Sequence, residues 1–169
     1  MTKVMAEKTR LDLETFVATE YPAVVAAVGL ITGNRQDAAD AVQDAIVGFL
    51  AKPPAHPVDN VAAWITVVAS NRVRDRYRRA AAEARALKKL APTETEVSEV
   101  EASLDRDVVA ALRELPHKQR QVCVLHYLLD QSVETIAEGL GVSQGTIKTH
   151  LHRARTALAA RLRKEDHRG

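Results

Sequence analysis

The 169-residue sequence contains few of the residues that define several common classes of protein. Its single cysteine, Cys123, excludes an intramolecular disulfide framework and a multi-cysteine zinc site. Aromatic residues make up only 4% of the chain, and there are 7 glycines and 6 prolines, which argues against a sheet sandwich or a loop-rich fold. No apolar run reaches the roughly 18 residues that a membrane span requires. These absences, with an N-terminal stretch that lacks the apolar core of a signal peptide, predict a cytoplasmic protein without direct membrane insertion.

The residues that are abundant predict packed α-helices. Apolar residues reach 46%, with alanine, leucine and valine dominant, so the chain has enough of them for a buried core. Residues 35–50 place apolar side chains at the i, i+3, i+4, i+7 spacing of an amphipathic helix, and Asn34 is its predicted N-cap. Pro22 predicts a break in the preceding helical region, and three prolines predict a loop over residues 52–58. We therefore expect an all-α fold.

The net charge of +2 conceals strong local imbalances. Residues 72–89 contain eight basic and two acidic side chains, and residues 148–168 contain seven basic and two acidic ones. Between them, residues 91–107 contain six acidic side chains and one basic side chain. Two basic segments separated by an acidic one indicate two surfaces for a polyanion. Solvated helix faces would have the same composition, so charge alone does not decide between these interpretations.

Composition divides the chain into two small helical domains joined by a flexible linker. We place the first domain at residues 1–90, an acidic linker at residues 91–103, and the second domain at residues 104–169. The linker segment has no apolar stripe and is rich in acidic and hydroxyl side chains. In the first domain, Asp59 or Asn60 can cap a long helix that becomes strongly basic toward its end.

A helix-turn-helix pattern begins at Ser132, the predicted N-cap of a short helix. Gly141 provides the sharp turn, Val142 is the expected apolar plug between the helices, and Ser143 is the predicted cap of the second helix. The outward face of that second helix contains polar and basic side chains: Gln144, Thr146, Lys148, Thr149, His152, Arg153 and Arg155. Basic side chains neutralise phosphates and reach guanine edges, and the shorter polar ones contact other base edges. This composition is typical of a recognition helix in the major groove.

Two blocks of sequence lead to a family. One runs from Leu115 to Arg155 and includes the helix-turn-helix, and the other contains DAADAVQD at 37–44, Trp64 and ASNRVRDRYRR at 69–79. In this order they resemble domain 4 and domain 2 of a bacterial RNA polymerase sigma factor, most closely of the extracytoplasmic-function (ECF) group. The resemblance implies a protein without enzymatic activity, cofactor or metal that binds core RNA polymerase and directs it to promoters.

The resemblance implies two DNA-binding surfaces. Domain 4 would read the −35 element with base-reading and phosphate-contacting side chains, namely Arg120, Ser132, Gln144, Thr146, Lys148, Thr149, His152, Arg153 and Arg155. Domain 2 would hold the opened −10 element next to the loop that ends at residue 60, with Asn60, Asn71, Arg72, Arg74, Arg76, Arg78 and Arg79. An asparagine amide suits a flipped base because it offers both a donor and an acceptor, whereas the arginines would follow phosphates.

The resemblance also implies protein partners. The clamp helices of the largest polymerase subunit would contact Asp40, Gln43, Asp44 and Phe49, and domain 4 would contact the flap region. An anti-sigma factor is the expected regulator, and it would hold this cytoplasmic protein at the membrane where that factor is itself membrane-bound.

Other residues favour structural roles. Cys123 lies in an apolar helical run, which predicts a buried thiol rather than a redox sensor, and Trp64 has the spacing of a core residue. His150 and His152 are two positions apart on one helix, so they point to different sides and predict no metal site.

A conventional helix-turn-helix regulator with a helical sensor or dimerisation domain is the alternative function. It predicts tight operator binding without polymerase and a palindromic site. A basic segment in each domain favours the sigma-factor interpretation, and a third hypothesis, a helical enzyme, finds no catalytic residues in the sequence.

Overall fold

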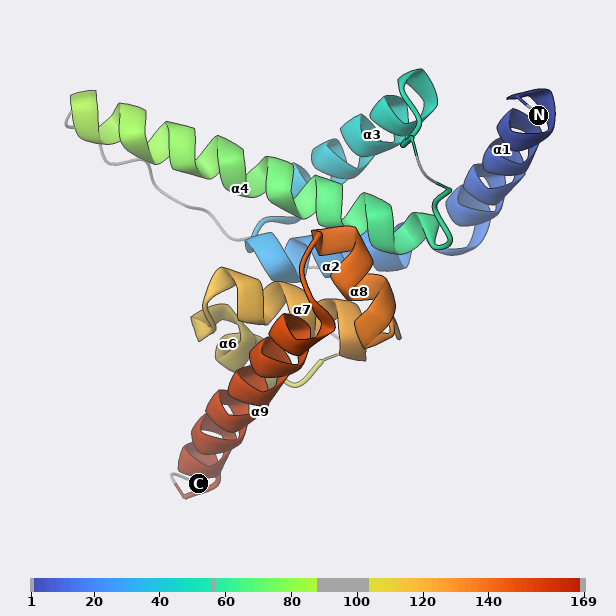
Figure 1. The fold of residues 1–169 in the computed structure, drawn as a ribbon. Helices are drawn as coiled ribbons and strands as arrows, with labels where there is room; N and C mark the ends of the chain where they lie inside the picture. Colours follow the sequence, from blue (N-terminus) through green and yellow to red (C-terminus); the bar gives the residue numbers. More distant parts are fainter. Residues whose placement is uncertain (1, 56, 88–103, 168–169) are drawn as a thin grey trace.

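The computed structural model describes residues 2–55, 57–87 and 104–167, and these residues form eight α-helices without a strand (Figure 1). In chain order the helices are α1 (Thr2–Thr19), α2 (Tyr21–Thr32), α3 (Arg35–Ala51), α4 (Val61–Leu87), α6 (Arg106–Glu114), α7 (His117–Tyr127), α8 (Val133–Leu140) and α9 (Gln144–Asp166). The prediction of an all-α fold is confirmed. The predicted linker at 91–103 lies outside the described residues.

Local sequence sets most helix boundaries. Pro22 stands in the first turn of α2, where its missing N–H leaves no hydrogen bond unmade, so the break falls just before it. Gly33 ends α2 with φ +85°, a left-handed conformation that only glycine adopts freely, and its N–H donates to the carbonyl of Gly29 at 2.7 Å. The Asn34 side chain then accepts from the backbone N–H of Asp37 at 3.0 Å and begins α3, as predicted.

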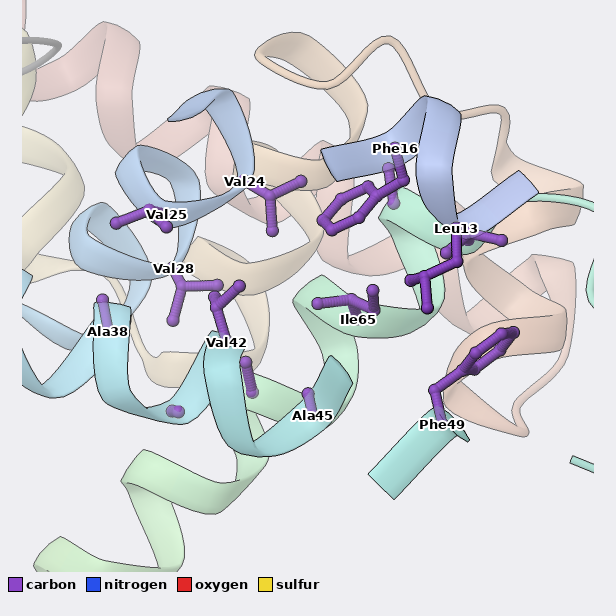
Figure 2. Close-up of a cluster of buried hydrophobic side chains, with 14 of the residues drawn as sticks. Leu13, Phe16, Val24, Val25, Val28, Ala38, Val42, Ala45, Phe49 and Ile65 are labelled. Atoms are coloured by element: carbon purple, nitrogen blue, oxygen red, sulfur yellow. The ribbon is translucent and has the colours of Figure 1, made fainter. Parts of the chain in front are cut away.

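Helices α1 to α4 form the N-terminal domain around one apolar cluster (Figure 2). Phe16 from α1, Val28 from α2 and Val42 from α3 are all at most 2% exposed in it. Trp64 is partly buried against this cluster, as predicted, and its ring meets that of Phe49 edge-on with centroids 5.1 Å apart.

Helices α6 to α9 form the C-terminal domain. Its two apolar clusters place Ile136 of α8 against Ile147 of α9, and Cys123 of α7 against Ala154 of α9. Cys123 is 4% exposed, and burial raises the pKa of its thiol. A buried, protonated thiol packs as a small apolar group, which confirms its predicted structural role.

The two domains pack directly against each other, and we call this packing the closed arrangement. Ala27, Leu30 and Ile31 of α2 share a cluster with Val109 of α6 and Val124 of α7. Val67 of α4 is 6% exposed and belongs to the cluster of the C-terminal domain rather than to that of its own domain. Figure 1 shows α7 beneath α2 and α8 beside α4, while the second half of α4 and the end of α9 extend away from the packed centre.

Candidate nucleic-acid interface

The helix-turn-helix consists of α8 and α9. The Ser132 hydroxyl caps α8 by accepting from the N–H of Thr135 at 3.1 Å, and the Ser143 hydroxyl caps α9 by accepting from the N–H of Thr146 at 3.1 Å. Gly141 adopts φ +65° between the two helices. Both predicted caps and the predicted turn residue are therefore confirmed.

Val142 corrects one expectation about this motif. Its side chain is 41% exposed, so it does not plug the space between the helices. Its backbone N–H instead closes the turn by donating to the carbonyl of Ala137 at 3.0 Å. Ile136 and Ile147, at 1% and 0% exposed, fill the space between the helices.

The outward face of α9 is open to solvent. Ile147, Leu151 and Ala154 point into the core and are at most 3% exposed. The opposite face is exposed and contains every α9 residue of the predicted −35 surface: Gln144, Thr146, Lys148, Thr149, His152, Arg153 and Arg155. Within the part of the chain that the structure describes, no carboxylate pairs with Lys148 or Arg153. The face is therefore cationic and available to a polyanion.

Helix α4 supplies a second basic face. Beyond Val73 its residues leave the core, and Arg72, Arg76, Arg78 and Arg79 are exposed while Arg74 is half-buried. Arg76 donates to the Asp44 carboxylate on α3 at 2.7 Å, but both side chains are about half exposed, at 45% and 53%. An exposed pair of this kind contributes about 0–1 kcal/mol, so a DNA phosphate can compete for Arg76.

Two asparagines of the predicted −10 surface have partners within the protein. Asn60 caps α4, because its side-chain oxygen accepts from the N–H of Ala63 at 2.8 Å. Asn71 is half-buried, and its side-chain oxygen accepts from the amide of Gln121 on α7 at 3.2 Å. In the closed arrangement the C-terminal domain thus bonds Asn71, one of the residues of the predicted −10 surface.

Gln121 was not singled out by sequence reasoning, and it is the central polar residue between the domains. It is 0% exposed, and its amide nitrogen also donates to the hydroxyl of buried Ser70 at 2.8 Å. In the sequence Gln121 closes the polar stretch 117–121 just before the apolar run 122–125, so no pattern marked it as buried. Because a buried polar group costs free energy unless it is hydrogen-bonded, these bonds fix how α7 sits on α4.

Arg120 lies at the same interface rather than on an open surface. Its guanidinium donates to three carbonyls, those of Ile31 at 3.0 Å and of Arg113 and Leu115 at 2.9 Å each. The bond to Ile31 crosses from α7 to the end of α2. In this arrangement three carbonyls engage Arg120, so its predicted contact with a −35 phosphate requires those bonds to break.

The acidic face of α3 is exposed at Asp40, Gln43 and Asp44, three of the four residues predicted to contact polymerase. Phe49 is a correction: it is 2% exposed and packs against Trp64, because it lies on the inner face of α3. The exposed apolar side chains at this end of the helix are instead Val47 and Leu50, at 63% and 57%. Apolar side chains beside exposed carboxylates suit a protein interface better than a buried ring does.

His117 begins α7 and faces the basic side of α4. Burial, together with the positive charges of Arg74, Lys118 and Arg120, lowers its pKa to about 4. Burial and the charge of Arg74 also lower the pKa of Lys118. Positive charge is therefore concentrated where α4 and α7 meet.

The described part of the chain contains neither a cluster of metal-ligating side chains nor a single helix that could span a membrane. Among residues 2–55, 57–87 and 104–167, no three histidine, cysteine or carboxylate side chains come together to hold a metal ion. No single helix there is long and apolar enough to cross a membrane, although segments 7–19 and 21–32, bent by 75°, meet the length and composition test as a pair.

A helix-turn-helix with a cationic outer face, preceded by a basic helix beside an acidic one, defines a two-module DNA-binding factor of the sigma-70 type. Residues 16–83 match the family model "Sigma-70 region 2", and residues 105–158 match "Sigma-70, region 4". The ECF RNA polymerase sigma factor SigW of Bacillus subtilis is 31% identical over 146 residues, covering 78% of each chain. The chain therefore belongs to the ECF RNA polymerase sigma factors.

Other relatives agree with this assignment. SigM of Mycobacterium tuberculosis is 33% identical over 132 residues, which cover 77% of this chain and 66% of SigM. EcfG of Rhodopseudomonas palustris is 32% identical over 160 residues, covering 89% of this chain and 85% of EcfG.

Solved structures share the fold over most of the chain. The sigma factor RpoE in complex with the anti-sigma factor NepR, from Bartonella quintana, has a TM-score of 0.74 and 26% identity, covering 90% of this chain and 97% of that one. CnrH in complex with the cytosolic domain of CnrY has a TM-score of 0.66 at 24% identity, which shows the shared fold.

Proposed function

We propose that this chain binds core RNA polymerase and directs promoter-specific transcription initiation, without a catalytic group of its own. The observation that supports this most strongly is the pairing of two cationic DNA-binding faces, on α4 and α9, within one chain that matches both sigma-70 regions in order. A single helix-turn-helix regulator needs only one such face.

In this proposal α9 reads the −35 element in the major groove. Lys148, Thr149, His152 and Arg153 contact base edges, because they share the exposed face of its N-terminal half. The phosphate contacts come from Gln144, Thr146, Arg155 and the α8 cap residue Ser132. Arg120 joins them only after it leaves the three carbonyls that it now binds.

The −10 element binds along α4 after the domains separate. Separation frees Asn71 from Gln121, so that its amide can bond an unstacked base. Arg72, Arg74, Arg76, Arg78 and Arg79 follow the phosphates of the opened strand. Asn60 acts by capping α4 and holding the adjoining loop in place.

Polymerase binds the exposed face of α3 in this proposal. Asp40, Gln43 and Asp44 meet the clamp helices of the largest subunit, with Val47 and Leu50 as apolar neighbours. The C-terminal domain meets the flap region.

We also propose regulation by an anti-sigma factor. The support is that this chain resembles, over 90% of its length and with a TM-score of 0.74, the sigma factor RpoE in complex with the anti-sigma factor NepR. The protein would then act in the cytoplasm, and any attachment to the membrane would come through that partner.

Run-off transcription with purified core polymerase tests the proposal. Core alone and core plus this protein are compared on genomic fragments, including the region upstream of its own gene. Discrete start sites that need the protein support the proposal. Absence of such starts, together with salt-sensitive, sequence-specific binding by the protein alone, would instead identify a conventional helix-turn-helix regulator.

A matched pair of variants locates −35 recognition on α9. Lys148→Ala removes a cationic side chain from the proposed base-reading face, and Arg163→Ala removes one from the exposed end of the same helix. We expect Lys148→Ala to cost about 1–3 kcal/mol of promoter binding and to change preference at one −35 position. Arg163→Ala should leave the preference unchanged, and equal effects of the two variants would contradict the assignment.

A further inference from the structure

A basic cavity of about 740 Å³ lies where the two domains meet. Its walls are the exposed half of α4, the end of α2 and the start of α7. The cationic side chains that line it are Arg74, Arg78, Arg79, Arg85 and Arg120, the neutral imidazole of His117 lies beside them, and Asp75 is the one acidic residue among the described lining residues. Since α4 belongs to one domain and α7 to the other, the cavity depends on the closed arrangement.

Most of the arginines of this cavity have no anionic partner among the described residues. Within the described residues, Arg74, Arg78 and Arg79 have no ion pair or hydrogen bond, and Arg85 donates only to the carbonyl of Ala81. The Nε2 atom of His117 is buried there without a hydrogen-bond partner, as is the Nε atom of Arg120. Buried polar atoms without a partner cost free energy, so the protein leaves both residues incompletely bonded at the wall of the cavity.

The cations also crowd one another. Burial is the largest cause of the lowered pKa of His117, and the positive charges of Arg74, Lys118 and Arg120 are the other causes. Like charges held close together repel, and a polyvalent anion placed among them converts the repulsion into attraction. The cavity therefore favours a negatively charged ligand.

The shape of the cavity points to a small ligand. Its volume falls within the range of about 300–1,000 Å³ that small-molecule sites occupy. Ala81 and Ala82 are short, so they leave room between the guanidinium groups of Arg78 and Arg85, while Ile31 and Tyr77 add apolar surface. A planar guanidinium bonds two phosphate oxygens at once, which makes arginine the preferred partner of phosphate groups.

We propose that this cavity binds a small polyphosphate anion, either inorganic polyphosphate or the phosphate chain of a nucleotide. A nucleic-acid strand fits the closed arrangement less well, because Asn71 is then held by Gln121 and α7 stands over the basic face of α4. The bound anion bridges the two domains and stabilises their packing. Under the proposed function, the bound anion also competes with −10 DNA for Arg74 and Arg78. This competition rests on the proposed function, whereas the binding of the anion does not.

Isothermal titration calorimetry of the full-length chain with sodium tripolyphosphate, at about 150 mM salt to screen diffuse attraction, tests the binding. Arg78→Gln and Arg85→Gln each remove one guanidinium from the cavity, and we expect each to weaken binding roughly tenfold or more. Arg72→Gln is the matched control, since it removes the same charge from an exposed position of α4 outside the cavity. It should change the affinity less than about twofold. An equal loss of tripolyphosphate affinity in all three variants would show that the anion is attracted by the overall positive charge of α4 and not by this cavity, and would overturn the proposal.

A second variant tests whether both domains are needed. Val67→Asp places a charge among the apolar side chains that join α4 to the C-terminal domain, without lining the cavity or entering the N-terminal core. We expect this variant to keep its helical circular dichroism and to lose most of its tripolyphosphate affinity. Undiminished binding by a folded Val67→Asp chain with separated domains would overturn the proposal.

Two further ligands identify the source of the phosphate. Metal-free ATP that binds more tightly than tripolyphosphate indicates a nucleotide, and equal affinities indicate that the phosphate chain alone is recognised; both support the site. A single-stranded oligonucleotide that binds the closed chain and is not displaced by tripolyphosphate would overturn it. Because no polymerase or promoter is present, a negative transcription assay would leave the binding result unaffected.

Discussion

His117 shows how one residue can make the packing of the domains sensitive to acid. Its pKa is lowered to about 4 in the folded protein, against an ordinary value of 6.5 in the unfolded chain, since burial and the charges of Arg74, Lys118 and Arg120 oppose its protonation. Between pH 6.5 and about 4 the unfolded chain binds a proton at this site that the folded chain does not. The free energy of unfolding must therefore fall as the pH falls through that window.

The variant His117→Asn removes this contribution. We expect wild-type stability, measured by urea unfolding, to fall more steeply than that of His117→Asn between pH 6.5 and 4, and the two to run parallel above pH 7. Comparing the two chains cancels the carboxylates that titrate in both. Parallel curves over the whole range would show that His117 takes up its proton as easily in the folded state.

Single residues were also where sequence reasoning was least secure. Phe49 and Val142 are both apolar, and the sequence placed the first at a partner surface and the second in a core, whereas the structure shows the reverse. Helical periodicity identifies the buried stripe of a helix but does not say which residues at its margins are covered. Val142 also donates its backbone N–H to the carbonyl of Ala137, a bond that no side-chain pattern encodes.

At the scale of elements, the turn between α8 and α9 depends on backbone conformation. Gly141 has φ +65°, and a Cβ there meets no atom within 4 Å, so strain and not a clash would penalise a side chain. We expect Gly141→Ala to lower the free energy of unfolding by about 1–2 kcal/mol. Gly145→Ala is the matched control, because its Cβ would meet only the Ser143 hydroxyl at an ordinary 3.7 Å inside α9. Alanine there should be neutral or stabilise the helix by up to about 1 kcal/mol.

Urea unfolding of the two glycine variants, followed by circular dichroism, checks this expectation. A Gly141→Ala chain as stable as the wild type would mean that the turn tolerates a different backbone path. In that case the orientation of α9 toward DNA would be set by core packing alone.

Elements were the scale at which the sequence was most informative. The caps at Asn34, Ser132 and Ser143 and the breaks at Pro22 and Gly141 act on their immediate neighbours, so a short window of sequence contains their whole cause. The outward face of α9 was predictable for the same reason. Which faces of α4 and α7 meet was not, because it depends on residues about 50 positions apart, such as Gln121 and Ser70.

At the scale of the whole molecule, the closed arrangement engages a residue from each of the two predicted DNA surfaces. Gln121 binds Asn71 of the −10 surface, and Arg120 of the −35 surface bonds the end of α2. Each domain thus bonds a residue of the other that is predicted to contact DNA. The apolar contacts of Val67 and Ile31 hold the domains together around these bonds, so opening must expose apolar surface and release both residues at once.

Under the proposed function, the hydrogen bonds of Gln121 to Ser70 and Asn71 limit how much of the free protein can bind −10 DNA. Gln121→Ala removes both bonds across the interface, and if it weakens closure by about 1 kcal/mol, the minor open population rises about fivefold. We expect the apparent affinity of the free chain for a single-stranded −10 oligonucleotide, measured by fluorescence anisotropy, to rise by the same factor. Gln119→Ala is the control on the same helix, outside these two bonds. Tighter binding by Gln121→Ala alone would show that closure withholds Asn71, whereas unchanged binding with an expanded radius of gyration would show that domain 2 binds the strand poorly even when open.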